Sequence, residues 1–241
     1  MRGGFPDSYL AANDADSLRI RQSFIRTYLE RDVPMFGPRI PAETLERLWT
    51  MLAYNQSTLL NASQLANSLA VSAPMVTNYI GLLVDLLLVR RLPPFHANVK
   101  KRLVKSPKTY IRDSGLVHAL LGIETHDELL GHPVVGASWE RFAIENLLAV
   151  APSRARASFY RTARGAEIDL LVELGARHGT WAIEIKRGLA PKAEKGFHIA
   201  LDGIRPDKAF LVYSGTDRYP KGNGIEAIGL HALAEALRNL R

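Results

Sequence analysis

The N-terminal part of the chain carries apolar residues at helical spacing. Between residues 14 and 90 they recur every three or four positions, which is the pattern of amphipathic helices. Pro34 ends the first stretch, because proline lacks a backbone donor and clashes with the preceding turn. Later come a short helix, a break at Val71 and Ser72, and a second helix with Pro74 in its first turn, which predicts a helix-turn-helix pair. The predicted helices span residues 16–33, 41–56, 61–71 and 72–89.

The pattern changes from residue 136 onward to short runs rich in β-branched and aliphatic residues, after a polar connection at residues 125–135. The order is helix, three strands, helix and strand, followed by a fifth strand and a closing helix. We therefore expect an α+β chain with a helical domain at residues 1–110 and a mixed-sheet domain at residues 111–241. The predicted elements lie at residues 136–151, 157–162, 166–174, 180–188, 191–204, 208–215, 224–230 and 231–241.

Three charged residues interrupt the apolar strands of this second part. Glu184 and Lys186 are two apart in one predicted strand, so their side chains share a face. Asp169 lies in the preceding strand and reaches the same place if the two strands pair. Buried carboxylates are costly unless they are paired or hold a metal, and two together repel unless a cation joins them. Magnesium suits such ligands and would polarise a phosphodiester, while Lys186 would hold the attacking water or offset transition-state charge.

Composition narrows the class of protein. The 241 residues are 47% hydrophobic and 23% charged, which is ordinary globular usage. There is no cysteine, so disulfides and cysteine-bound zinc are excluded, and we expect a cytoplasmic protein. No apolar run approaches the ~20 residues of a membrane span, and the N-terminus lacks the apolar region of a signal peptide.

Positive charge is concentrated in one window. The net charge is +7, yet residues 86–112 contain eight basic residues and no acid. This window predicts contact with a polyanion, the alternative being a solvated basic loop. It begins with an apolar run that resembles the wing of a winged-helix domain. The residues we expect to contact nucleic acid, most simply DNA, are Ser72, Thr77, Asn78, Arg90, Arg91, Lys100, Lys101 and Arg102.

The acidic strands resemble a known nuclease signature. Asp169 followed by Glu184-Ile185-Lys186 is similar to the D…(D/E)xK motif of the PD-(D/E)XK nuclease superfamily, and the element order is similar to its core. The resemblance implies catalytic roles for Asp169, Glu184 and Lys186. It also implies a metal-binding glutamate on the preceding helix, where Glu140 matches and Glu145 is the alternative. The proline that often precedes the first acid is replaced by Ile168.

A narrower resemblance extends over nearly the whole chain. The segments GGFPDSYL, FIRTYLERDV, KTYIRDSGL, GASWERFAIENLL, FYRTARGAEIDLLVE and AIEIKRG together resemble the C-terminal region of bacterial and archaeal AAA-type ATPases, in which a winged helix joins a nuclease-like module. Those ATPases carry the phosphate-binding run G-x-x-x-x-G-K-[ST], which does not occur here. We expect no ATP site and no ATP hydrolysis from this chain alone.

Three functional hypotheses follow. The first is a magnesium-dependent nuclease with a DNA-binding arm. The second is a non-catalytic DNA-binding or regulatory module on a degenerate nuclease fold. The third is an interaction platform for a partner ATPase. An acidic cluster at metal-bridging distance favours the first, and a site filled by Arg161 or Arg164 favours the second. An apolar patch on the N-terminal helices favours the third.

Overall fold

The computed structural model describes residues 1–35, 41–95 and 103–240. The chain forms two compact units, Met1–Arg91 with Thr109–Arg141 and Leu92–Lys108 with Phe142–Arg241. It passes from one unit to the other within strands β1 (Val89–Leu92) and β2 (Lys108–Ile111), which form a two-stranded sheet, and within helix α8 (Val135–Val150). Each unit therefore contains two separate stretches of sequence.

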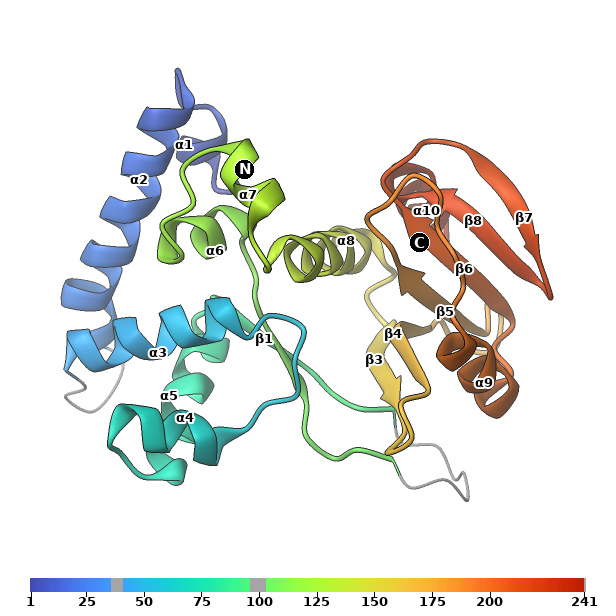
Figure 1. The fold of residues 1–241 in the computed structure, drawn as a ribbon, viewed down its shortest axis with the longest axis horizontal. Helices are drawn as coiled ribbons and strands as arrows, with labels where there is room; N and C mark the ends of the chain where they lie inside the picture. Colours follow the sequence, from blue (N-terminus) through green and yellow to red (C-terminus); the bar gives the residue numbers. More distant parts are fainter. Residues whose placement is uncertain (36–40, 96–102, 241) are drawn as a thin grey trace. The chain divides into compact units, whose positions relative to one another are not determined.

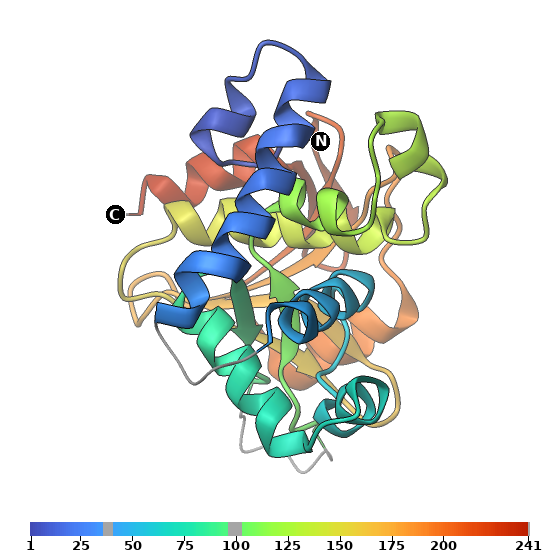
Figure 2. The same ribbon diagram turned by 90° about the vertical axis from the view of Figure 1, so that its left-hand side faces the viewer.

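The first unit is helical, as the sequence predicts (Figures 1 and 2). Its core is built on fully buried Leu48, Trp49 and Ile80. A π-helical turn (Tyr28–Asp32) and a 3₁₀ turn (Val33–Met35) follow the second helix, so the backbone changes pitch before Pro34. The helices before α8 are α1 (Pro6–Tyr9), α2 (Asp14–Thr27), α3 (Ala42–Tyr54), α4 (Ala62–Leu69), α5 (Ala73–Asp85), α6 (Ser114–Leu120) and α7 (His126–Gly131).

The predicted helix, break and helix are present as α4 and α5. Helix α4 ends at Ala70, whose φ of +54° lies in the left-handed region and stops the helix. Ser72 begins α5 by accepting the backbone N–H of Met75 on its hydroxyl at 3.4 Å. Pro74 occupies the first turn, where it removes a donor that has no helical partner.

Helix α7 lies where a polar connection was expected. Thr125 and Glu128 explain it, because each side chain accepts the other's backbone N–H. This capping box satisfies two donors at the start of a helix of only six residues.

The second unit is a six-stranded mixed sheet (Figure 1). Its strand order is β3-β4-β5-β6-β8-β7. The pairs β3–β4, β4–β5 and β7–β8 are antiparallel, whereas β5–β6 and β6–β8 are parallel. The mixed sheet in the C-terminal part confirms the coarse prediction. Its elements are β3 (Arg156–Arg161), β4 (Glu167–Glu173), β5 (Thr180–Ile185), α9 (Lys195–Ile204), β6 (Lys208–Tyr213), β7 (Arg218–Gly222), β8 (Ile225–Gly229) and α10 (Leu230–Arg238).

Helix α9 covers part of the sheet with its apolar side. Phe197 and Ala200 are fully buried against Leu171, Ala182 and Leu211 of the three central strands. Helix α9 also connects the parallel strands β5 and β6, which need a crossover of this kind. The strand before this crossover carries Glu184, and Lys186 follows it directly.

The outer edge of β3 is partly covered by residues 93–95 and 103–104, which lie between β1 and β2 in the sequence. Pro94 forms a bridge with Phe159, and the N–H of Phe95 donates to the Phe159 carbonyl at 2.6 Å. Further along, Leu103 forms a bridge with Thr162. The first edge strand therefore does not present a free row of backbone groups. Within the described residues, no helix combines the length and the apolar character needed to cross a membrane.

Candidate functional site

The pairing of β4 with β5 brings the predicted acidic residues together. Leu170 lies opposite Ile183, and the same register places Asp169 opposite Glu184. Directly opposed residues of an antiparallel pair project to the same face. Asp169 Oδ2 accepts the backbone N–H of Ile185 at 2.9 Å, and Lys186 Nζ lies 3.1 Å from Glu184 Oε1.

The two carboxylates lie in a poorly hydrated environment. The side chains of Asp169 and Glu184 are only 13% and 10% exposed. Burial, reinforced by the charge of Asp169, raises the pKa of Glu184 to about 8. Burial also raises the pKa of Asp169, against the opposing effect of Lys108. Glu184 Oε2 is buried and has no hydrogen-bond partner among the residues that the structure describes, so a proton or a cation at this oxygen would be favourable.

Lys108 places a positive charge beside this acidic pair. In the sequence it is one of the eight basic residues of the window at residues 86–112. Its side chain is only 2% exposed, and Nζ lies 2.8 Å from Glu167 Oε1 and 3.6 Å from Asp169 Oδ1. The ammonium also lies 5.6 Å from the centre of the Phe159 ring, a cation–π contact. The sequence gives little sign of this burial, because only Tyr110 and Ile111 are apolar between Thr109 and Arg112.

A second cation lies at the exposed side of the pair. Lys186 Nζ contacts Glu194 Oε1 at 2.9 Å in addition to Glu184. Burial lowers the pKa of Lys186, but its bonds to Glu194 and Glu184 outweigh that effect, so the pKa lies above its ordinary value. Arg161 Nε lies 3.5 Å from Glu167 Oε2, whereas Arg164 is exposed. The acidic centre therefore combines four acidic and three basic side chains, namely Asp169, Glu184, Glu167 and Glu194 with Lys108, Lys186 and Arg161.

Glu140 lies on α8 within the first unit. The Tyr110 hydroxyl donates to Glu140 Oε1 at 2.9 Å. Glu145 is half-buried on the part of α8 that belongs to the second unit. Over the described part of the chain, no three aspartate, glutamate or histidine side chains are grouped as a metal would need. Asp169 and Glu184 are the carboxylates that could hold a magnesium ion, which would take its other ligands from water.

The predicted nucleic-acid residues of α5 and β1 lie in the first unit. Thr77 and Asn78 are exposed on α5, while Ser72 caps that helix. Arg91 donates to the Thr77 carbonyl at 2.9 Å, and Arg90 is half-buried on β1. The predicted contacts at Lys100, Lys101 and Arg102 lie outside the described residues.

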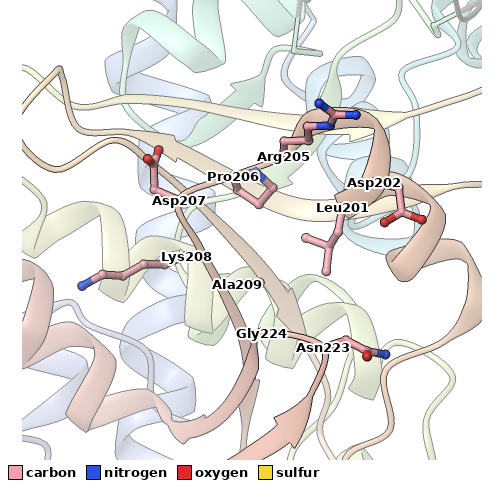
Figure 3. Close-up of a pocket in the computed structure, with 9 residues that line it drawn as sticks. All are labelled: Leu201, Asp202, Arg205, Pro206, Asp207, Lys208, Ala209, Asn223 and Gly224. Carbon is pink, nitrogen blue, oxygen red and sulfur yellow. The ribbon is translucent and has the colours of Figure 1, made fainter.

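A separate hollow of about 460 Å³ lies at the start of β6, where the chain enters from α9. Figure 3 shows that Arg205 and Lys208 at its rim point in different directions. Lys208 Nζ lies over the Trp181 ring at 4.8 Å, and Asp207 accepts the Thr180 N–H at 2.7 Å. Lys208 and Asp207 are thus engaged by β5, and the charged side chains that line the hollow do not converge on one point (Figure 3).

Sequence comparison places the chain in a family. Residues 1–127 match the model described as "Domain of unknown function (DUF8612)", which covers more than half of the chain. The chain belongs to the DUF8612 family. Residues 135–233 of this DUF8612 chain match a second model, "Domain of unknown function (DUF4143)", which contains Asp169, Glu184, Lys186 and Glu194.

Two mycobacterial proteins are similar to nearly all of the chain. They are the "Uncharacterized protein Rv2008c" of Mycobacterium tuberculosis (strain ATCC 25618 / H37Rv) and the "Uncharacterized protein Mb2031c" of Mycobacterium bovis (strain ATCC BAA-935 / AF2122/97). Each is 42% identical over 229 residues, which is 95% of this chain and 51% of the relative. The chain therefore spans about half the length of these curated relatives. No solved structure matches it.

Proposed function

We propose that the second unit is a magnesium-dependent phosphodiesterase module that acts on nucleic acid, with the first unit as its DNA-binding arm. The observation that carries this proposal is the pairing of Asp169 and Glu184 on neighbouring strands, with Lys186 on the same face. The order α8, β3–β5, α9, β6 supports it, because it resembles the core of PD-(D/E)XK nucleases.

The side chains have complementary roles in this proposal. Bound at Asp169 and Glu184, a magnesium ion would polarise the scissile phosphate and lower the pKa of a water. Glu184 offers its buried Oε2, and Asp169 is held in place by the Ile185 N–H. Lys186 places its ammonium beside Glu184, where it offsets negative charge that develops on the phosphate.

The unit's place in a larger protein is part of the same proposal. The resemblance to the C-terminal region of AAA-type ATPases suggests that this pair of units serves an ATPase core. The helix pair α4–α5 and strand β1 would then act as the winged-helix arm, with Thr77 and Asn78 exposed toward DNA.

Lys108 favours a second candidate function, a non-catalytic DNA-binding or regulatory module on a degenerate nuclease fold. Its buried ammonium already neutralises Glu167 and Asp169, which is the electrostatic role that a metal would have. In that case the acidic centre is a structural ion-pair network.

One set of variants separates the two candidates. Calorimetry with magnesium or manganese measures metal binding, and labelled DNA and RNA measure cleavage. The nuclease proposal predicts that Asp169→Asn and Glu184→Gln each lose both metal binding and cleavage. Lys186→Met should keep metal binding and lower the cleavage rate about 100-fold or more. Glu173→Gln is the matched control, because Glu173 lies at the far end of β4.

Two measurements together would contradict the nuclease proposal. If the unmodified protein binds no metal at millimolar concentration and Asp169→Asn raises stability, the nuclease proposal fails. Lys108→Met then decides the reason, since a gain of metal binding on removal of its ammonium would show that Lys108 occupies the place of the metal.

A further inference from the structure

Lys186 is held by two carboxylates that come from different elements. Its Nζ lies 3.1 Å from Glu184 Oε1 on β5 and 2.9 Å from Glu194 Oε1 at the start of α9. The Glu184 side chain is buried, whereas the Glu194 side chain is 72% exposed. The ammonium therefore lies at the boundary between the buried acidic pair and solvent.

Glu194 stands at a helix position where its side chain would ordinarily serve the helix itself. It is the N-cap residue of α9, and N-cap side chains accept backbone N–H groups of the first turn. The Glu194 side chain makes no such bond, and only its backbone carbonyl accepts from Phe197 and His198. Its carboxylate points instead to Lys186.

Stability alone is a weak reason for this arrangement. An ion pair with a largely exposed carboxylate contributes little to folding, because water screens it and two side chains lose freedom. The effect of Glu194 on the position of the Lys186 ammonium is larger. Attraction to Glu184 draws the ammonium toward the buried pair, whose negative charge it would neutralise there. Glu194 draws it outward, toward solvent.

We propose that Glu194 is a positioning residue that holds the Lys186 ammonium at the solvent side of the Asp169–Glu184 pair, where the attacking water and the scissile phosphate would lie. This inference rests on the proposed phosphodiesterase function. Glu194 acts through Lys186 and touches neither the metal nor the phosphate.

The test compares Glu194→Gln with Glu235→Gln. Glu235 forms an exposed ion pair with Arg238 on α10, 3.5 Å apart, and serves as the matched control. We expect Glu194→Gln to lower kcat about tenfold, the equivalent of one charge-assisted hydrogen bond, with KM and magnesium affinity within about twofold. In a Lys186→Met background, Glu194→Gln should cause no further loss.

A readout independent of catalysis is the ¹⁵N-detected ammonium signal of Lys186, assigned by its loss in Lys186→Met. Hydrogen bonds to two carboxylates slow exchange of its protons, so the signal should be visible in the unmodified protein and should broaden in Glu194→Gln but not in Glu235→Gln.

The outcomes are distinguishable. If no nucleic acid is cleaved but the ammonium signal is lost in Glu194→Gln, the positioning stands and the phosphodiesterase proposal fails. An unchanged signal together with unchanged kcat overturns the role of Glu194. A loss of magnesium affinity of tenfold or more also overturns it, because Glu194 would then act on the metal directly.

Discussion

Replacing Lys108 with methionine tests whether its buried ammonium holds the acidic centre together. Methionine keeps most of the apolar stem, so the change removes the charge with little change in packing. Asp169 would then lose the ammonium 3.6 Å from its Oδ1, in a site where its side chain is only 13% exposed. Glu167 would lose its 2.8 Å contact but keep Arg161 at 3.5 Å.

The expected loss follows from these two carboxylates. Removing one partner of a buried ion pair costs about 3–5 kcal/mol, because the other charge remains buried without compensation. Glu167 is partly hydrated and Asp169 keeps the N–H of Ile185, so we expect the lower end, about 3 kcal/mol. In a chain of 241 residues this corresponds to a fall in Tm of roughly 6–12 °C.

Urea unfolding followed by circular dichroism measures this loss. Asp169→Asn in the Lys108→Met background should recover about 2 kcal/mol, because the uncompensated charge is gone. Lys208→Met is the control, since Lys208 is an exposed residue whose ammonium lies over Trp181, and it should cost less than about 1 kcal/mol. If Lys108→Met costs as little as this control and Asp169→Asn restores nothing, Lys108 does not compensate the carboxylates.

Two further predictions concern the first unit and the basic window. Burial lowers the pKa of His118 to about 4, so the unfolded chain takes up a proton near pH 6.5 before the folded chain does, and about 3 kcal/mol of stability should be lost as the pH falls from 6.5 to 4. The difference in unfolding free energy between the unmodified protein and His118→Gln should show this slope. His231→Gln, at a side chain that is 90% exposed, is the control substitution. Changing Lys100, Lys101 and Arg102 together to glutamine should flatten the log–log salt dependence of duplex binding by roughly 2 to 3, and an unchanged slope would place the phosphate contacts elsewhere.

Local sequence patterns predicted the acidic pair because its members lie on strands joined by a short turn. Alternation placed Glu184 and Lys186 on one face, and the six residues between β4 and β5 left antiparallel pairing as the simplest arrangement. The same local information predicted α4, α5, α9 and the mixed sheet. The structure then brings together Asp169, Glu184 and Lys186.

The rest of the centre depends on contacts that local patterns do not contain. Lys108 is about sixty residues from Asp169 in the sequence, and their contact depends on the tertiary fold, in which Pro94 and Leu103 also form bridges with residues at β3. The contact of Glu194 with Lys186 could not be predicted from the sequence, because it depends on the residue at which α9 begins. Helix ends are the least predictable part of a helix. Strand β7 escaped prediction because Pro220 and three exposed polar or glycine neighbours do not alternate with apolar residues.

The cover over the edge of β3 has a consequence for how this sheet can be inherited. Pro94, Leu103 and Lys108 belong to the unit that holds the sheet, yet they are encoded upstream of the match to DUF4143 at residues 135–233. A gene segment cut to that match would carry the strands without the stretch that shields their edge, and without the ammonium that balances Asp169. Recombination can therefore move this sheet intact only together with the helices encoded between its two pieces. Residues 109–141 of the helical unit are thus expected to be gained, lost and duplicated together with the sheet.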